Sequence, residues 1–189
     1  NAMKTRVGEA EQEIVRLQNE LTETSELVRH DQLTGALNRK GLEEALDREL
    51  ARSQRRKTPI CVALLDVDNF KMLNDTYGHQ TGDEALIHLA RVIRETMRPH
   101  DTLVRYGGEE FLIILPDTPL PDAVSALTRL QRELTKRFFL HQNEKLLITF
   151  SAGVTAFHAN ESRNETISRA DAAMYQAKKS GKNRVVPAD

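Results

Sequence analysis

The sequence predicts an α/β (α+β) domain in which an antiparallel-centred sheet is flanked by helices, preceded by an N-terminal coiled-coil helix. Three observations support this fold class. A continuous apolar run at residues 59–66 is typical of a strand that is buried on both faces of a sheet. Two further apolar segments are joined by Gly107-Gly108, a dipeptide that indicates a tight hairpin. The first 30 residues are mainly polar, with apolar side chains at helical spacing.

The composition fits a soluble globular protein with one long polar element. The chain has 189 residues, of which 39% are hydrophobic and 29% charged, enough for one ordinary domain and an extension. The net charge of −1 favours neither nucleic acid nor an anionic membrane as a partner. No apolar stretch approaches the roughly 20 residues that cross a bilayer, so we expect no membrane contact from these residues. The single cysteine, Cys61, excludes an internal disulfide and suits a cytoplasmic location.

Residues 1–30 predict a helical stalk, distinct from the globular domain at residues 31–189. Seven positions follow the alternating spacing of three and four that marks a coiled-coil seam: Val7, Ala10, Ile14, Leu17, Leu21, Thr24 and Val28. The narrow stripe favours a parallel paired stalk; a single amphipathic helix folded back on its own domain is the alternative. Residues 1–3 resemble the remnant of a tag. Because the helical pattern is already under way there, we expect an upstream sensor domain in a longer parent protein, which can be membrane-associated.

The segment at residues 31–39 interrupts the helical pattern and separates the stalk from the domain. Asp31 is typical of a helix boundary, and Gly35 permits a turn. Asn38 is a favourable N-cap for the next helix, which we expect at about residues 39–55.

Beyond this helix the pattern alternates between strands and helices. We expect strands or strand regions at residues 59–66, 102–106, 109–115, 145–157 and 185–186, with residues 138–142 as a partner for the fourth. Helices are expected between them, at residues 68–76, 82–98, 121–138 and 166–179. The resulting order β-α-α-β-β-α-β-α-β suits an α/β layer of the ferredoxin-like or polymerase-palm kind.

Two carboxylates end the first strand. In the segment Asp66-Val67-Asp68, strand alternation can place Asp66 and Asp68 on one face while Val67 points away. A carboxylate at the end of a buried strand is costly unless it is paired or binds a cation. Magnesium commonly uses one or two carboxylates together with substrate phosphates. The alternative is a strand end where the acids meet water and cap the following helix.

The hairpin brings a second acidic pair. Gly107-Gly108 places Glu109 and Glu110 at the start of the next strand, where alternation would send their side chains to opposite faces. At most one of them should then face the same metal as Asp66. Two acidic clusters at the ends of two apolar strands indicate a two-metal site for phosphoryl or nucleotidyl transfer. A glycine turn followed by two surface acids is the alternative.

Five motifs occur in an order that resembles one protein family. They are DQLTGALNR at 31–39, DVDNFKMLNDTYGHQTGDEAL at 66–86, RYGGEEF at 105–111, SAGV at 151–154 and ADAAMYQAKKSGKNR at 170–184. Together they resemble the GGDEF family of diguanylate cyclases, in its GGEEF form, over about residues 31–186. The chain departs from the family pattern at Ala36, where leucine often follows the glycine directly, and this affects no residue of the chemistry.

The resemblance implies a metal-dependent enzyme. Asp66 and Glu109 correspond to metal-ligand carboxylates, with the backbone carbonyl of Val67 as a third ligand. Glu110 is implied as a catalytic residue beside them, through metal contact or by supporting the site. Two Mg²⁺ ions per active site are implied as cofactors, with Mn²⁺ as an alternative.

The resemblance also implies a set of GTP-binding residues. The pair that reads guanine corresponds to Asn74 and Asp83, whose amide and carboxylate match the edge of the base. The remaining substrate-binding positions line the base pocket or approach the ribose and phosphates: Phe70, Leu86, Lys71, Arg105, Gly107, Gly108, Lys178 and Lys182. Taken singly, each has a structural alternative, such as a helix-dipole acid for Asp83 or a helix C-terminus for the two late lysines.

The implied reaction joins two GTP molecules into cyclic di-GMP and releases two pyrophosphates. The 3′-hydroxyl of one GTP attacks the α-phosphate of another, across two domains that face each other in a homodimer. Pairing of the stalk would then raise the effective concentration of the two domains. The alternative is a catalytically silent GGDEF domain that senses cyclic di-GMP or GTP.

A candidate feedback site precedes the hairpin. Arg98-Pro99-His100-Asp101 resembles the family's RxxD inhibitory site, where the product binds away from the active site. An arginine can contact a phosphate or a guanine, and an aspartate can accept hydrogen bonds from guanine. Arg129 on the following helix is expected to assist. A helix-terminal arginine beside a loop aspartate is the alternative.

Overall fold

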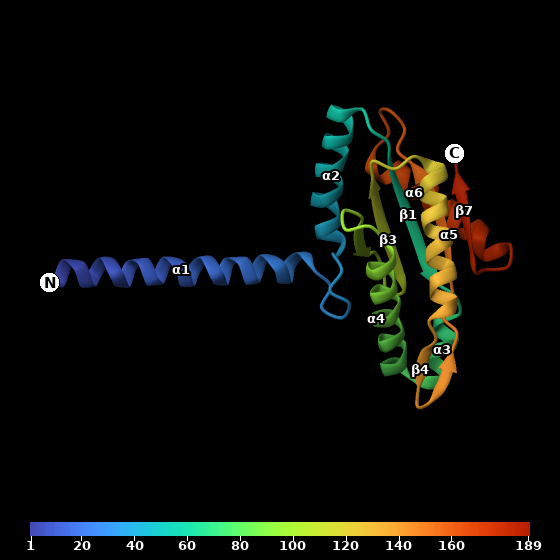
Figure 1. Cartoon of the computed structure of the whole chain (residues 1–189), viewed down its shortest axis with the longest axis horizontal. Coiled ribbons are helices and arrows are strands. Elements are labelled where there is room, and N and C mark those ends of the chain that lie inside the picture. Colours follow the sequence, from blue (N-terminus) through green and yellow to red (C-terminus); the bar gives the residue numbers. More distant parts are fainter.

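A five-stranded sheet runs through the centre of the domain in the order β2-β3-β1-β6-β7 (Figure 1). Its strands are β1 (Ile60–Val67), β2 (Thr102–Arg105), β3 (Glu110–Pro116), β6 (Phe150–Ala156) and β7 (Arg184–Ala188). The first three pairings in this order are antiparallel, and β6 pairs with β7 in parallel. This computed structural model describes residues 1–189 except for the side chain of Glu26. The predicted α+β fold with an antiparallel centre is confirmed.

Helices cover both faces of the sheet. They are α2 (Arg39–Arg56), α4 (His79–Thr96), α5 (Leu120–Lys136) and α6 (Arg163–Lys179), while α3 (Phe70–Tyr77) packs mainly against α4. One face of the sheet buries its side chains against α4 and α5, and the other against α2 and α6. Strand β1 lies between the two layers, and all eight of its residues are buried. This position explains why its sequence is almost entirely apolar.

Helix α6 packs closely on β6 because of Gly153. A Cβ built on this glycine would lie 2.0 Å from the carbonyl oxygen of Ala170 and 2.5 Å from the nitrogen of Met174. A side chain cannot be accommodated at such distances, so the helix backbone approaches the strand only where glycine stands. The glycine of the SAGV motif therefore determines how closely α6 approaches β6.

The structure corrects the predicted hairpin between β2 and β3. Four residues, not two, separate the strands, since β2 ends at Arg105 and β3 begins at Glu110. The amides of Tyr106 and Gly107 both donate to the carbonyl oxygen of Glu110, at 2.8 and 3.1 Å. Glu109 therefore lies in the turn and not in the strand.

Other predicted boundaries also change, and α6 begins at Arg163 and not at residue 166. The strand region expected at residues 145–157 divides, because β5 (Glu144–Leu146) pairs with β4 (Phe139–His141) in a separate hairpin and β6 begins at Phe150. Helix α4 begins three residues earlier than predicted. Gly78, with a φ of 95°, ends α3 and lets the chain enter α4 at once.

Helix α1 (Ala2–Arg29) extends away from the domain (Figure 1). Residues of the predicted seam are exposed, among them Val7, Ile14, Leu17 and Leu21, the last to 71%. The stripe is therefore not covered by its own domain, and pairing of the stalk stays a prediction. Within the described residues, no helix combines the length and apolar character needed to cross a membrane.

Asn38 joins the stalk to α2 by capping both helices. Its Oδ1 accepts a hydrogen bond from the nitrogen of Gly41 at 3.0 Å, which is the N-cap predicted from the sequence. Its Nδ2 donates to the carbonyl oxygen of Val28 at 2.7 Å, and its backbone nitrogen donates to that of Arg29 at 2.8 Å. One residue thus satisfies a donor at the start of α2 and acceptors at the end of α1.

Substitutions of Asn38 separate these two caps. Asn38→Asp keeps the oxygen that caps α2 and loses the amide donor to Val28, whereas Asn38→Ala loses both. We expect Asn38→Ala to lower the free energy of unfolding by about 1–2 kcal/mol and Asn38→Asp to lower it less. Urea unfolding followed by circular dichroism measures both values, with the exposed Glu43→Ala as a control on α2. Equal losses in the two Asn38 variants would show that the α2 cap contributes nothing.

Candidate active site

Three carboxylates meet where β1 ends and β3 begins. Asp66 and Glu110 are directly opposite each other in the antiparallel ladder, so their side chains share the sheet face covered by α2 and α6. Glu109 comes from the preceding turn, and its carbonyl oxygen accepts a hydrogen bond from the nitrogen of Val67 at 3.1 Å. Its side chain lies close enough to that of Asp66 for a protonated Glu109 to donate a hydrogen bond to it. The premise that both glutamates lie in the strand is wrong, because Glu109 lies in the turn before β3, and strand alternation therefore does not send its side chain away from Asp66.

Crowding of these acids disfavours their charged forms. Burial, the negative charge of Asp66 and the hydrogen bond between the two side chains raise the pKa of Glu109 to about 7. Burial first, and then the charges of Asp66 and Asp171, raise the pKa of Glu110. Lys178 opposes both shifts, with its Nζ 3.0 Å from Oδ1 of Asp66, a residue that is only 4% exposed. The single positive charge of Lys178 therefore neutralises the negative charge of the three carboxylates only in part.

The donor set fits a divalent cation. Among the described residues, no three His, Cys, Asp or Glu side chains are arranged as a ready-made metal cage. Asp66 and Glu109 nevertheless place two interacting carboxyl groups beside the backbone of Val67. Mg²⁺ commonly needs only one or two carboxylates, because water and phosphate oxygens complete its shell. The residues predicted as ligands therefore lie together and have the chemistry that Mg²⁺ or Mn²⁺ requires.

The predicted guanine-reading residues lie at the junction of α3 and α4. Oδ1 of Asn74 is buried and has no hydrogen-bond partner among the described residues. It faces Gly82, where an added Cβ would lie 1.8 Å from this oxygen. A buried acceptor without a partner costs about 1–3 kcal/mol, so such atoms are expected where a ligand binds. Asp83 follows Gly82 directly and is exposed at the same junction.

Of the two apolar residues predicted for the base pocket, Phe70 lies at this junction and Leu86 lies in the core of the same layer. Phe70 and Leu86 are both buried, Leu86 to 1% exposure in the core. The ring of Phe70 would lie 3.2 Å from a Cβ on Gly82. Sequence reasoning missed Gly82, and its position in the first turn of a helix, where glycine is unfavourable, was the available signal.

Two of the three predicted phosphate-binding lysines lie at the end of β1. Lys178 on α6 pairs with Asp66, and Nζ of Lys182 donates to Oδ1 of Asn69 at 2.6 Å. Lys71 is exposed on α3. The two late lysines thus bring positive charge to the loop that joins β1 to α3.

Fold and sequence both match known proteins. Residues 28–184 match the family described as "Diguanylate cyclase, GGDEF domain". The chain belongs to the GGDEF family. It is 39% identical to the diguanylate cyclase DgcP of Pseudomonas aeruginosa over 184 residues, which cover 97% of this chain and 27% of DgcP. It is 40% identical to the response regulator PleD of Caulobacter vibrioides over 173 residues, which cover 90% of this chain and 38% of PleD.

The structure is similar to that of the coiled coil and GGDEF domain of DgcB from Caulobacter crescentus in complex with c-di-GMP. The TM-score is 0.92 and the sequence identity 34%, and the match covers all of both chains. The likeness therefore includes the long N-terminal helix. The curated relatives are much longer, since this chain spans only 27% of DgcP and 38% of PleD.

Two arginines hold the signature turn of this GGDEF domain. Arg105, one of the predicted substrate-binding residues, pairs with Asp31 at 3.1 Å and donates to the carbonyl oxygen of Gly108 at 2.7 Å. Arg39 donates from Nε to the carbonyl oxygen of Tyr106 at 2.7 Å, and its guanidinium lies 4.0 Å from the centre of the Tyr106 ring. Sequence reasoning missed Asp31 and Arg39 as supports of this turn, although both lie in the first motif.

The two glycines of the turn have different surroundings. A Cβ on Gly107 would lie 3.0 Å from Oε2 of Glu110, whereas one on Gly108 would meet nothing within 4 Å. Gly107 therefore lets the carboxylate of Glu110 approach the turn. The open space beside Gly108 is compatible with the predicted approach of a substrate.

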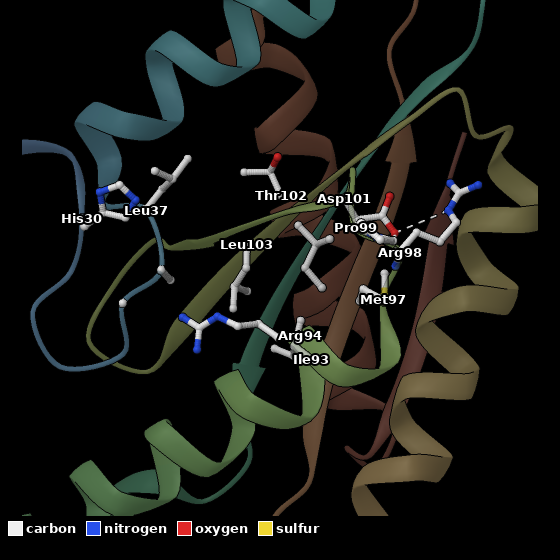
Figure 2. A pocket seen from close by; sticks show the side chains of 13 residues that line it. His30, Leu37, Ile93, Arg94, Met97, Arg98, Pro99, Asp101, Thr102 and Leu103 are labelled. Atoms are coloured by element: carbon white, nitrogen blue, oxygen red, sulfur yellow. Dashed lines mark hydrogen bonds and ion pairs between the residues drawn. The ribbon is translucent and has the colours of Figure 1, made fainter. Parts of the chain in front are cut away.

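The predicted inhibitory pair borders a cavity of about 370 Å³ between α4, β2 and the segment before α2 (Figure 2). Oδ2 of Asp101 accepts a hydrogen bond from the nitrogen of Arg98 at 3.0 Å and lies 3.6 Å from its Nε. The side chain of Asp101 is 2% exposed, and its Oδ1 has no hydrogen-bond partner among the described residues. Arg98 also donates to the hydroxyl of Thr118, and Arg94 lines the same cavity. Arg129 is exposed on α5, outside the cavity lining.

Asp66→Asn is expected to lower the pKa of Glu109 from about 7 toward the ordinary range of a glutamate, because it removes a neighbouring negative charge. Carboxyl ¹³C NMR of the metal-free protein, titrated from about pH 3 to about pH 9, measures this value. Asp171→Asn is the matched control and should act on Glu110 instead. A pKa of Glu109 that stays near 7 in Asp66→Asn would contradict the contact.

The same titration has a consequence for stability. Because the pKa of Glu109 is raised from 4.5 to about 7 in the folded state, the unfolded chain releases this proton more readily. The contribution of Glu109 to the stability of the metal-free protein is therefore present below pH 4.5 and is lost as the pH rises to about 7.

Proposed function

We propose that this chain is a diguanylate cyclase that condenses two GTP molecules into cyclic di-GMP and releases two pyrophosphates. The main observation in its support is that Asp66, Glu109 and Glu110 lie close together at the end of β1. Carboxylates at such close range, with Asp66 buried and the two glutamates half-buried, need cations or protons. The buried, unpartnered oxygen of Asn74 adds a place for a base. Membership of the GGDEF family and similarity to named diguanylate cyclases support the same reaction.

Asp66, Glu109 and the backbone carbonyl of Val67 would hold Mg²⁺ or Mn²⁺, with two ions per active site. When bound, these ions supply positive charge to the phosphates and favour deprotonation of the attacking 3′-hydroxyl. Glu110, directly opposite Asp66, adds negative charge that strengthens cation binding. Strand β1 supplies a rigid frame for this cluster because every one of its residues is buried.

The other predicted residues bind and orient GTP. Oδ1 of Asn74 can accept a hydrogen bond from the guanine amino group, and Asp83 can accept from the same edge of the base. Lys178 and Lys182 lie where they can neutralise the triphosphate, and Lys71 adds a third positive charge from α3. Recognition of the base and of the phosphates would thus come from opposite ends of the β1–α3 segment.

The reaction requires two GTP molecules and therefore two copies of this site. The exposed seam of α1 offers a surface for a parallel coiled coil, which would tether two domains in a homodimer. The greater length of DgcP and PleD leaves room for further domains in a parent protein. An upstream sensor domain would then act through the stalk on the meeting of the two sites.

Product inhibition would act at the cavity beside Arg98 and Asp101. The unpartnered Oδ1 of Asp101 can accept a hydrogen bond from guanine, and Arg98 can contact a phosphate. Arg129 would assist from α5 only if the ligand extends beyond the cavity lining. Binding of c-di-GMP to the related DgcB is consistent with a site for this product.

A catalytically silent domain that senses cyclic di-GMP or GTP is the competing function. The retained carboxylates of the active site argue against it, because a sensor has no need to crowd Asp66, Glu109 and Glu110.

The proposal is tested by incubating the pure protein with GTP and Mg²⁺ and analysing the products by chromatography. We expect cyclic di-GMP and pyrophosphate in a ratio of about one to two, as the balanced reaction requires. Asp66→Asn should lower the rate by at least about a hundredfold, whereas the exposed Glu43→Gln on α2 should leave it unchanged. Folded protein that binds GTP and forms no product at high concentration would favour the sensor.

Arg98→Ala tests the inhibitory site. We expect the concentration of cyclic di-GMP that halves the initial rate to rise by about tenfold, because a charged contact to the product is lost. Initial rates of pyrophosphate release at several product concentrations give this value. Arg91→Ala is the matched control, since Arg91 is an arginine on α4, which ends two residues before Arg98, and it lies outside the cavity lining. Inhibition that is unchanged in Arg98→Ala would refute the site.

A further inference from the structure

The turn that follows α6 has an unfavourable backbone conformation. Gly181, Lys182 and Asn183 all have positive φ values, of 122°, 62° and 45°. Non-glycine residues in this region cost about 1 kcal/mol each, so the surrounding structure must stabilise the turn. The turn carries one of the predicted phosphate-binding lysines, Lys182, and begins three residues after the other, Lys178.

Hydrogen bonds from two separate elements fix this turn at Asn183. The backbone nitrogen of Asn183 donates to Oδ2 of Asp68 at 2.9 Å. On the other side, Nε2 of Gln131 on α5 donates to both the backbone carbonyl and the side-chain oxygen of Asn183. The conformation of the turn is thus held from the end of β1 and from α5.

Asp68 is itself held in place by β6 and the residue before it. Its Oδ1 accepts from the hydroxyl of Ser151 at 2.6 Å, and its Oδ2 accepts from the hydroxyl of Thr149 at 2.7 Å. No ion pair of Asp68 occurs among the described residues, in contrast to Asp66, which pairs with Lys178. Three hydrogen bonds therefore orient the carboxylate of Asp68, and its oxygens are engaged by donors other than a metal.

We propose that Asp68 is a positioning residue, which holds the turn so that Lys178 and Lys182 face the end of β1, and that it is not a metal ligand. With the turn in place, Nζ of Lys178 lies 3.0 Å from Asp66, and that of Lys182 lies 2.6 Å from Asn69. The inference rests on the proposed function, since the ligand of these lysines would be the triphosphate of GTP.

The geometry makes asparagine a discriminating substitution. In Asp68→Asn, the amide oxygen can still accept from Thr149 and Asn183, while the amide nitrogen can donate to the hydroxyl of Ser151. Asp68→Asn thus keeps the positioning contacts and removes the charge that a metal ligand would need. Asp68→Ala removes both.

Steady-state kinetics with varied GTP and Mg²⁺ test the proposal. We expect Asp68→Ala to raise the KM for GTP by about tenfold with kcat changed by less than about threefold. The reason is that the turn loses the hydrogen bonds to Asp68, so that the lysines are no longer held where they would contact the triphosphate. Asp68→Asn should restore most of the affinity, and the Mg²⁺ concentration for half activation should stay at the wild-type value in both variants. Gln131→Ala should raise KM in the same direction, because it releases the turn from the other side. Asp75→Ala, an exposed acid on α3, is the control.

Two results would overturn the assignment. One is an Asp68→Asn variant that is as inactive as Asp66→Asn and needs more Mg²⁺, as expected for a lost metal ligand. The other is an Asp68→Ala variant with an unchanged KM. Hydrogen exchange at the amide of Asn183 gives a readout independent of turnover, and it should be at least about tenfold faster in Asp68→Ala. If the wild-type protein makes no product, the proposed function fails, while this exchange rate still decides whether Asp68 holds the turn.

Discussion

Strand β1 is enclosed on both faces by helices and on both edges by neighbouring strands, and the candidate site is built from the way this strand ends. Asp66, the last residue but one of this strand, lies at the edge of the core, where a carboxylate is stable only with charged or hydrogen-bonding neighbours. Each neighbour reaches it from another element: Glu110 by strand register, Glu109 through the turn before β3, and Lys178 from α6. The closely packed core thus fixes the positions of groups that repel one another.

The segment between stalk and domain is connected to the same site by continuous contacts. Asn38 caps α1 and α2, and the next residue, Arg39, binds the carbonyl oxygen of Tyr106 in the signature turn. Asp31 reaches the other end of the turn through Arg105. These contacts link α1 to the turn that presents Glu109.

Local sequence patterns were sufficient to predict those features that depend on a single helix or strand. The helix start at Asn38 followed from capping preference, and the buried strand with Asp66 at its end followed from its apolar run. Features that depend on how elements meet could not be predicted in this way. Glu109 faces Asp66 because the turn has four residues, a length set by the pairing of β2 with β3. The donors to Asp68 come from residues more than eighty positions away, and no local signal announces them.

The length of α1 gives its junction with the domain a mechanical meaning. Its 28 residues correspond to a rod of about 42 Å, at about 1.5 Å per residue. A tilt of about 10° at the end held by Asn38 would displace the far end by about 7 Å on this length. Read in the opposite direction, a displacement of several ångströms at the remote end becomes a rotation of only a few degrees at the domain. In the proposed homodimer, the stalk would therefore convert large displacements of its far end into small rotations of the domain.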